Sequence, residues 1–539
     1  MDMGEMGKNL AGRLWDWAGE GWTEAVLHVS ATDRWRSFDA WTDAPDPEHP
    51  SSLMDRLHGI IPRDAPLAVY EVVLRADGTY RFASSSEVST LSPARLVIDP
   101  AVRCPNHPVP GMPRPAAAEP TGQPTDPGVL REVGALVTEF ADRYTAITGH
   151  APEWEPGRTE EEIAAAEARI RARLPEDLRA LYRLVGRDTP ESGLLGYYAH
   201  DSLEELVERY CDGPPGSYGG VAEERPLDDA DVVFDAAPPG RIKRLLRNDW
   251  WVTFGGNHSG EMIAVDLDPA EHGRHGQVLE VGDILGVPRY LAGSVTAMLT
   301  EIVTELRANR VTHQEGDPRL DVAAAFHQYP YREHRHILHG VADLNLAAIV
   351  TDLEQPDLVQ AFYLNDGNHI DLAVLESLTS LREIGVHRTD TVTPTVSNLP
   401  ELESLTMDAA TVDLAPLTGH PTLWDLKLAN LTHPVELDVL ATLPRLTRLC
   451  IAGLDVPDIE DLGRLSALRV VTVDATQLDR LLSSGCPLPK LAAVRINGRV
   501  LLREAVEFRR NLTGTRVQLG ETAGTLPAPA PDNERQDGR

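Results

Sequence analysis

The 539-residue sequence predicts a multidomain α+β protein with a small N-terminal α/β domain, a middle α+β domain and a C-terminal repeat solenoid. Three observations lead to this prediction. The length suits two to four domains of roughly 100–200 residues each. A proline-rich segment separates the first domain from the second, and a hydrophobic motif recurs six times in the last third. The expected parts are residues 1–104 for the first domain, 105–128 for a linker, 129–310 for the middle domain, 311–357 for a helical connector, 358–515 for the repeats and 516–539 for a disordered tail.

The composition is that of an acidic globular protein. Hydrophobic residues make up 42% of the chain and charged residues 25%, which argues against wholesale disorder. Lys and Arg number 50 against 83 Asp and Glu, so the formal net charge is −33, of which residues 1–374 carry −28 and residues 375–515 only −4. Such a chain repels phosphate backbones and attracts basic proteins, so we expect no nucleic-acid partner. Solubility alone is the plainer explanation of the acidity.

Targeting and redox features are few. The four cysteines are too few and too widely spaced for a disulfide framework or a CxxC metal knuckle. The N-terminus lacks the pattern of a signal peptide, and no stretch approaches the ~18 apolar residues of a membrane span. We therefore expect a cytoplasmic protein with no membrane partner.

The N-terminal domain is predicted from strand and turn patterns. Residues 22–29 alternate as a strand does, and residues 67–83 hold two apolar runs around Asp77-Gly78, which is a hairpin signal. No chemistry stands out in this domain, so its role stays open. Helical patterns occupy residues 8–18 and 51–60.

The linker and the tail are predicted from what they lack. Residues 105–128 hold eight prolines in 24 positions, which blocks helices and sheet ladders and favours an extended connector. From Glu521 the sequence has almost nothing apolar to bury, so a disordered tail is expected.

Helix caps open the middle domain. Thr159 and Glu162 form a T-x-x-E capping box, Ser202 and Glu205 repeat it, and Pro175 stands where a first helical turn tolerates it. The pattern then changes to strands and ends in a helix, which together predict an α+β domain. The strand runs are residues 250–254, 262–266 and 277–281, and the closing helix is near 292–306.

Three segments of the middle domain resemble the SUKH superfamily, which includes fungal cell-wall-assembly regulators and bacterial toxin-immunity proteins. They are Leu174 to Tyr182, Trp251 to Asp268, and Gly276 to Val278. The resemblance implies a mixed α+β fold that recognises other proteins and has no catalytic residues. It also implies that Trp251 and Phe254 are core, that the glycines form a turn and that Asp266 ends its strand. The motif residues are Leu174, Pro175, Trp251, Phe254, Gly255, Gly260 and Asp266.

Six copies of the motif L-x-x-L-x-L, spaced by 21, 21, 23, 22 and 23 residues, occupy the last third of the chain. This is the leucine-rich-repeat pattern, in which one short strand per repeat stacks in parallel over a continuous core. The asparagine that usually follows the last anchor is missing, so packing is expected to hold the turns. The anchors are Leu381, Leu402, Leu423, Leu446, Leu468 and Leu491, with a degenerate copy at Leu358.

Alternate positions of the repeat strands are expected on the concave side, away from the leucines. This surface is mixed, small and polar. Trp424 is either a binding anchor or packed under a loop, and Cys450 has no activating base nearby in the sequence. The predicted protein-binding residues are Glu383, His387, Asp408, Asp425, Lys427, Arg448, Asp474 and Arg495.

A histidine group is the best metal lookalike. His334, His336 and His339 have His327 and Glu333 nearby, and a helix would place His336 and His339 on one face. Without HExxH or a nearby cysteine, a polar connector helix is the favoured interpretation.

The glycine-rich segment Gly255–Gly260 precedes a strand and lacks the Walker lysine, so it predicts a hairpin turn rather than a phosphate loop. His258 and Ser259 are adjacent in this turn, where a base and its nucleophile cannot easily pair. No catalytic residue, metal or cofactor is therefore predicted.

These observations favour a non-enzymatic protein-binding protein, above all an immunity-like protein that binds and neutralises a cationic bacterial toxin such as a nuclease. The alternative is a leucine-rich-repeat scaffold or regulator without a toxin partner. A third hypothesis is a metal-dependent enzyme that uses the histidines of residues 327–339.

Overall fold

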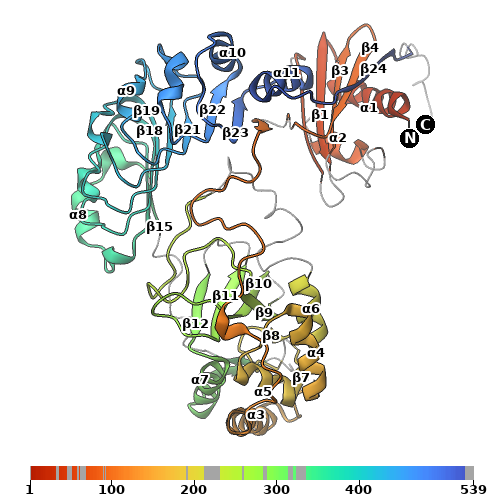
Figure 1. Ribbon diagram of the computed structural model, residues 1–539, viewed down its shortest axis with the longest axis vertical. Coiled ribbons are helices and arrows are strands. Elements are labelled where there is room, and N and C mark those ends of the chain that lie inside the picture. Colours follow the sequence, from red (N-terminus) through yellow and green to blue (C-terminus); the bar gives the residue numbers. More distant parts are fainter. Residues whose placement is uncertain are drawn as a thin grey trace, which may run out of the picture.

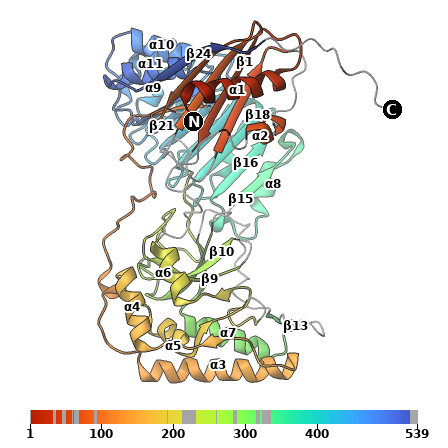
Figure 2. The ribbon, with the colours of Figure 1, turned by 90° about the vertical axis from the view of Figure 1, so that its right-hand side faces the viewer.

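The computed structural model arranges the chain in two masses (Figure 1). The N-terminal sheet and the repeat region lie side by side in one mass, and the middle domain forms the other, as the turned view in Figure 2 also shows. The structure describes residues 2–31, 36–44, 51–57, 60, 68–88, 90, 93–189, 192–211, 231–257, 260–282, 288–313, 320–322 and 335–527.

The N-terminal domain is a five-stranded antiparallel sheet of order β2-β1-β3-β4-β24, packed against helix α1. The predicted hairpin is confirmed, and Gly78 in its turn has a φ of +84°, a region that favours glycine. Gly7 lets α1 approach the sheet, because a Cβ there would lie 2.7 Å from Phe82 Cβ. The bounds are α1 Met3–Ala18, β1 Glu24–Ala31, β2 Arg36–Thr42, α2 Ser51–Leu57, β3 Ala68–Arg75 and β4 Thr79–Ser85.

Strand β24, Gly520–Thr525, corrects the prediction of a disordered tail. It pairs antiparallel with β4 at the edge of the N-terminal sheet, and Leu526 N donates to Gly78 O at 2.9 Å. The prediction was wrong here because a strand at a sheet edge is held by backbone hydrogen bonds, which need no apolar side chains. Residues 528–539 of the predicted tail lie outside the described residues.

The middle domain has a five-stranded sheet of order β12-β11-β10-β9-β8 that shares a core with its helices. Both predicted capping boxes are confirmed: Glu162 N donates to Thr159 Oγ1 at 3.2 Å, and Glu205 N donates to Ser202 Oγ at 3.1 Å. The bounds are α3 Pro127–Thr148, β6 Glu155–Pro156, α4 Glu160–Ile170, α5 Glu176–Leu184, β7 Val185–Arg187, β8 Ala199–His200, α6 Leu203–Cys211, β9 Trp251–Gly256, β10 Glu261–Asp266, β11 Gln277–Gly282, β12 Arg289–Ala292 and α7 Val295–Arg307.

Helix α3 has no counterpart among the predicted elements. Its signal is present in the sequence, since the Asp126 side chain accepts from Gly128 N and Val129 N and Pro127 opens the first turn. The linker before it, which the structure describes throughout, forms no strand, and its only helical part is the short 3₁₀ helix η1, Ala116–Ala118. Ala118 is buried in the core of the middle domain, so the linker packs against that domain.

The connector is not the helical segment predicted for residues 311–357. Strand β13, Val311–His313, pairs with β14, Leu320–Val322, and β15, Arg335–Leu338, adds a parallel strand beside β16. Strand β15 forms because the edge of the repeat sheet offers unpaired backbone groups that a further strand satisfies. The helical parts are short: η5 Val341–Asp343, α8 Leu346–Thr351 and η6 Pro356–Leu358.

Each of the six predicted repeats contributes one parallel strand to a sheet of order β15-β16-β18-β19-β20-β21-β22-β23, with β17 beside β18. The inward-facing residues of neighbouring strands are in register and belong to one buried core that includes Leu405, Leu426 and Leu449. The strands are β16 Ala361–Asn365, β17 His369–Asp371, β18 Glu383–Thr393, β19 Ser404–Val412, β20 Asp425–Ala429, β21 Arg448–Cys450, β22 Val470–Asp474 and β23 Ala493–Asn497. The helical turns are η7 Leu372–Leu375, η8 Ala415–Leu417, α9 Leu437–Leu440, η9 Ile459–Arg464, α10 Ala475–Ser483 and α11 Leu502–Thr513.

The N-terminal domain closes the β23 end of the repeat sheet. Strand β5, Ala94–Val97, pairs antiparallel with β23, and the buried core of the repeats continues into β3 and β4. The buried Glu71 carboxylate accepts from Leu502 N at 2.5 Å, at the start of α11, and lies 2.8 Å from His28 Nε2. The N-terminal domain and the repeats therefore form one composite unit.

The middle domain is an insertion in this composite unit. The chain enters it after β5, at one end of the repeat sheet, and returns at β15, at the opposite end. No helix in the described part of the chain is long and apolar enough to cross a bilayer.

Candidate functional site

The motif residues of the middle domain are structural. Trp251 and Phe254 are buried in β9, as expected, and Leu174 is buried just before α5, which Pro175 caps. Gly260 has a φ of +101° in the β9–β10 turn, and a Cβ on Gly255 would lie 2.3 Å from Ala199 O. These residues stabilise the fold of the domain, so other residues must bind any partner. His258 and Ser259 lie outside the described residues.

Asp266 ends β10 and holds the turn that follows, as expected. Its carboxylate accepts from Asp268 N at 2.9 Å and from Gln277 Nε2 at 2.8 Å. Burial raises the pKa of Asp266 to about 6, against the lowering effect of these two hydrogen bonds. Asp266 is thus a structural carboxylate that costs stability when it ionises.

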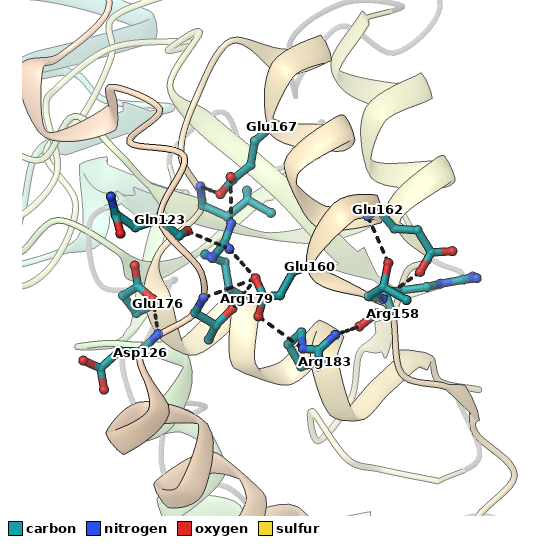
Figure 3. Close-up of polar contacts among 12 residues, drawn as sticks. Gln123, Asp126, Arg158, Glu160, Glu162, Glu167, Glu176, Arg179 and Arg183 are labelled. Carbon is teal, nitrogen blue, oxygen red and sulfur yellow. Dashed lines mark hydrogen bonds and ion pairs between the residues drawn. The ribbon is translucent and has the colours of Figure 1, made fainter.

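A buried arginine organises helices α4 and α5 (Figure 3). The side chain of Arg179 is 1% exposed and forms ion pairs with Glu160 and Glu167, each at 2.7 Å. Glu160 also pairs with Arg183 at 3.3 Å, and Glu167 accepts from Leu174 N at 2.8 Å. The network fixes the position of α4 relative to α5.

The same network holds the end of the proline-rich linker, as Figure 3 shows. Arg173 Nη1 donates to Gln123 O at 2.8 Å, and Thr125 N donates to Glu160 Oε2 at 3.2 Å. Asp126 N donates to Glu176 Oε2 at 2.9 Å. The linker is therefore anchored to the middle domain by polar contacts to its backbone.

A pocket of about 740 Å³ lies where helices α3, α5 and α7 begin. Two of its carboxylates serve the fold, since Asp177 accepts from Thr296 N at 3.0 Å and Glu176 accepts from Asp126 N. Glu132 and Glu301 extend the acidic lining, against one arginine and one histidine, Arg274 and His275. The pocket therefore suits a basic side chain better than an anion.

His200 is a buried histidine of the same domain. It has no exposed surface, and its ring lies 4.4 Å from the ring of Tyr182, centroid to centroid. Burial lowers the pKa of His200 to about 4, because the charged ring loses hydration, against backbone contacts that raise it.

The low pKa of His200 predicts an acid-dependent loss of stability. Between pH 6.5 and about 4 the unfolded state binds a proton that the folded state does not, so stability falls as the pH falls. Full titration is worth about 3 kcal/mol. Asp266 has the opposite effect between pH 3.8 and about 6, because its pKa is raised in the folded state, so the pH dependence of wild-type stability alone does not isolate His200. We measure the free energy of unfolding in urea. When the pH is lowered from 7 to 4, we expect the value for His200→Phe to rise by about 3 kcal/mol relative to that for wild type. A constant difference would contradict this.

The second candidate surface is the face of the repeat sheet opposite the leucine core. Its first row, defined by strand register, is Ala361, Glu383, Ser404, Asp425, Arg448, Val470 and Ala493. Most of this row is buried, including two predicted binding residues, Asp425 (1% exposed) and Arg448 (5%). The prediction that these two are available to a partner is wrong, since other parts of the chain cover the row.

Asp425 and Arg448 form a bidentate ion pair beneath that cover. Arg448 Nε and Nη2 donate to the two Asp425 oxygens at 2.7 and 2.8 Å, and Ser404 Oγ donates to Asp425 Oδ2 at 2.8 Å. Burial alone would raise the pKa of Asp425, but Arg448 and the hydrogen bonds hold it below its ordinary value. The Arg448 guanidinium also lies 5.1 Å from the centre of the buried Trp424 ring.

The other predicted binding residues differ in accessibility. Lys427 is exposed, and His387, Asp408 and Arg495 are half-buried. Glu383 accepts from Tyr363 Oη at 2.7 Å, and Asp474 caps α10 by accepting from Gln477 N at 2.8 Å. Lys427, His387, Asp408 and Arg495 thus remain as candidates on this face.

The segment Asp231–Ala236 of the middle domain, here called the cis segment, covers part of the first row. Val232 and Phe234 are buried in one apolar cluster with Trp424, Val470 and Ala493, and Cys104, the residue just before the linker, joins it. The cis segment was missed, although its apolar run VVF flanked by aspartates stands in a stretch otherwise rich in proline, glycine and acids.

The histidine group does not form as predicted. His336 lies in strand β15 rather than on a helix, and its ring stacks on Phe362 at 5.7 Å. His339 follows the end of β15 at Leu338, so the two histidines do not share the helix face that was predicted for them. Within the described residues no cluster of His, Cys, Asp or Glu could hold a metal ion. His327, Glu333 and His334 lie outside them.

Comparison with known proteins adds a family for the middle domain. Residues 157–301 match the SMI1 / KNR4 family (SUKH-1). This SUKH-1 region spans α4 to α7, so it includes the Arg179 network, His200 and most of the pocket. The match covers about a quarter of the chain and is consistent with a protein-interaction role for that part. No curated protein matches the chain.

Two solved structures are similar to part of the chain. One is an internalin (inlF) from Listeria monocytogenes, with 20% identity, 28% of this chain and 45% of that chain covered, and a TM-score of 0.22. The other is an internalin C2 (inlC2) from the same species, with 21% identity, coverage of 27% and 75%, and a TM-score of 0.20. The chain thus spans less than half of the first structure. Strand register, rather than these similarities, defines the repeats.

Proposed function

We propose that this is a non-enzymatic protein-binding protein whose SUKH-1 region binds and neutralises a cationic bacterial toxin, as an immunity protein does. The match of residues 157–301 to the SUKH-1 family carries the proposal. The charge of −28 over residues 1–374 supports a basic partner, because complementary charge speeds and orients association.

In this proposal the acidic pocket at the starts of α3, α5 and α7 receives basic side chains of the toxin. Glu132 is exposed on α3, and Glu301 on α7 is half-buried, so both can be approached from solvent. Binding there would block the toxin sterically and by charge, without chemistry on either partner.

Charge reversal in the pocket tests the proposal. The full chain first serves as bait to capture basic proteins from bacteria related to its source, and affinity for the captured toxin is then measured by calorimetry. We expect Glu132→Lys/Glu301→Lys to weaken binding at least tenfold, since losing about 1.4 kcal/mol of attraction suffices.

The matched control is Glu153→Lys/Glu208→Lys, which makes the same charge change at exposed positions of the same domain outside the pocket. It should bind within about twofold of wild type. Equal weakening by both variants would assign the effect to net charge and sink the pocket assignment. Capture of no toxin-like protein by the wild-type chain would sink the immunity function.

The second candidate function is a repeat-based scaffold or regulator, with the solenoid of leucine-rich repeats as the binding element. The exposed Lys427 on β20 and the half-buried Arg495 on β23 favour it, because each lies two residues after a member of the first row and so on the same face of the sheet. In that case Lys427→Glu would reduce capture of the partner, and the pocket variant would leave it unchanged.

A further inference from the structure

The residues one position before the first row of the repeat sheet, among them Gln360 and Arg382, make contacts to the cis segment that are specific to an extended peptide. Gln360, the residue before β16, forms two side-chain hydrogen bonds with the backbone of Asp235. Its Oε1 accepts from Asp235 N at 2.7 Å, and its Nε2 donates to Asp235 O at 2.9 Å. A side-chain amide used in this way copies a backbone partner and recognises extended chain whatever its sequence.

A second contact selects an acidic side chain. Arg382 Nε and Nη2 both donate to Asp235 Oδ2, at 3.1 and 2.5 Å. Arg382 is itself fixed by Glu403 at 2.9 Å and by Glu401 at 3.0 Å. Because the arginine is held before the peptide arrives, less conformational entropy is lost on binding the aspartate.

A third contact selects apolar and aromatic side chains. Val232 and Phe234 are 7% and 6% exposed and share a cluster with Trp424 and Val470. The guanidinium of Arg335 on β15 lies 5.6 Å from the centre of the Phe234 ring. Buried aromatic anchors of this kind dominate the affinity of peptide interfaces.

The middle domain also contacts this segment, at two residues. Arg244 Nη1 donates to Val233 O at 3.0 Å and pairs with Glu403 at 2.5 Å, while Ala236 packs in the core beside Trp251. The cis segment is therefore held by the middle domain at Val233 and Ala236, and by the repeats at Val232, Phe234 and Asp235.

We propose that the first row of the repeat sheet, together with the preceding residues Gln360, Arg382 and Trp424, is a binding site for an extended peptide. The peptide carries an aromatic residue followed by an acidic one, and the cis segment fills the site. A partner segment of the same chemistry competes for the site in trans. Because only the small open fraction of molecules can accept it, the apparent affinity of wild type for such a peptide is lowered by that fraction. The inference does not depend on the proposed function, since it concerns the repeats and an acidic ligand.

Peptide binding tests the site. The probe is a fluorescent peptide of residues 231–239, DVVFDAAPP, titrated with the full chain in anisotropy measurements. The variant Phe234→Ala/Asp235→Ala empties the site by removing the two anchors of the cis segment. We expect the peptide to bind this variant at least tenfold more tightly than wild type. A peptide in which the same two residues are alanine should bind neither protein.

A third substitution tests whether the peptide binds at this site. Adding Gln360→Ala to the emptied variant should lower its affinity for the peptide at least fivefold, because both hydrogen bonds to the peptide backbone are lost. Should the double variant fail to unfold cooperatively, Asp235→Asn replaces it, which keeps Phe234 and removes only the charge. A folded emptied variant that binds the peptide no better than wild type would overturn the proposal. So would binding that does not depend on Gln360.

Discussion

Replacing Arg448 with alanine is expected to lower the free energy of unfolding by about 3–5 kcal/mol. The arginine forms a bidentate pair with Asp425, and the two side chains are 6% and 1% exposed. Among the residues that the structure describes, removing the cation leaves the buried carboxylate with only Ser404 and the more distant Lys427, at 3.8 Å, as polar partners. Thermal and urea unfolding followed by circular dichroism measure the loss.

The control for Arg448→Ala removes both charges. The double variant Arg448→Met/Asp425→Leu keeps the volume and leaves no unpaired ion, so we expect it to be much closer to wild type in stability. If the single and double variants were equally destabilised, packing rather than charge would explain the loss. If Arg448→Ala cost less than about 1 kcal/mol, the pair would be hydrated and the first row would not be covered.

Ending the chain after Thr515 is expected to destabilise the N-terminal domain by about 3 kcal/mol, although the change is at the other end of the sequence. The truncation removes β24, which pairs with β4 over six residues. It also removes Gln518, whose carbonyl accepts from Ser85 Oγ at 3.0 Å and whose N–H donates to Glu87 at 3.1 Å. Each lost hydrogen bond costs about 0.5–1.5 kcal/mol net, reduced where water replaces the partner.

Hydrogen exchange locates the effect of this truncation. The amides of β4 should exchange faster, while those of α5 and β10 in the middle domain should be unchanged. The matched control ends the chain after Leu526, which keeps β24 intact and should behave as wild type. Unchanged exchange in β4 after truncation at Thr515 would contradict the pairing of β24.

The sequence predicts best where the signal is local or periodic. Thr159 and Glu162 are three residues apart, and the side chain of each accepts a hydrogen bond from the backbone of the other. The Asp77-Gly78 hairpin depends only on the geometry of its own turn. The leucine anchors repeat, so one correct register fixes all six strands. The SUKH resemblance agrees with the family match because its aromatic strand and glycine turn are contiguous in the sequence.

Partners distant in sequence explain what could not be predicted. Strand alternation correctly places Asp425 and Arg448 outside the leucine core, but nothing in the repeats shows that residues 231–236 lie over them. Likewise, β24 has no apolar pattern, and its partner strand is more than 400 residues away. His336 joins β15 because the edge of β16 needs a partner, which its neighbours in sequence do not reveal.

The pairing of β4 with β24 also sets a schedule for folding on the ribosome. Strand β4 ends at Ser85, but the strand that completes its sheet ends at Thr525, more than 400 residues later in the order of synthesis. At roughly 5–20 residues per second, the first domain waits about 20–90 s for its last strand. The middle domain is complete much earlier and can fold while the N-terminal sheet still has an open edge. That open edge is a site where a nascent chain can pair with another copy, so chaperone binding to ribosome-bound chains should concentrate on β4.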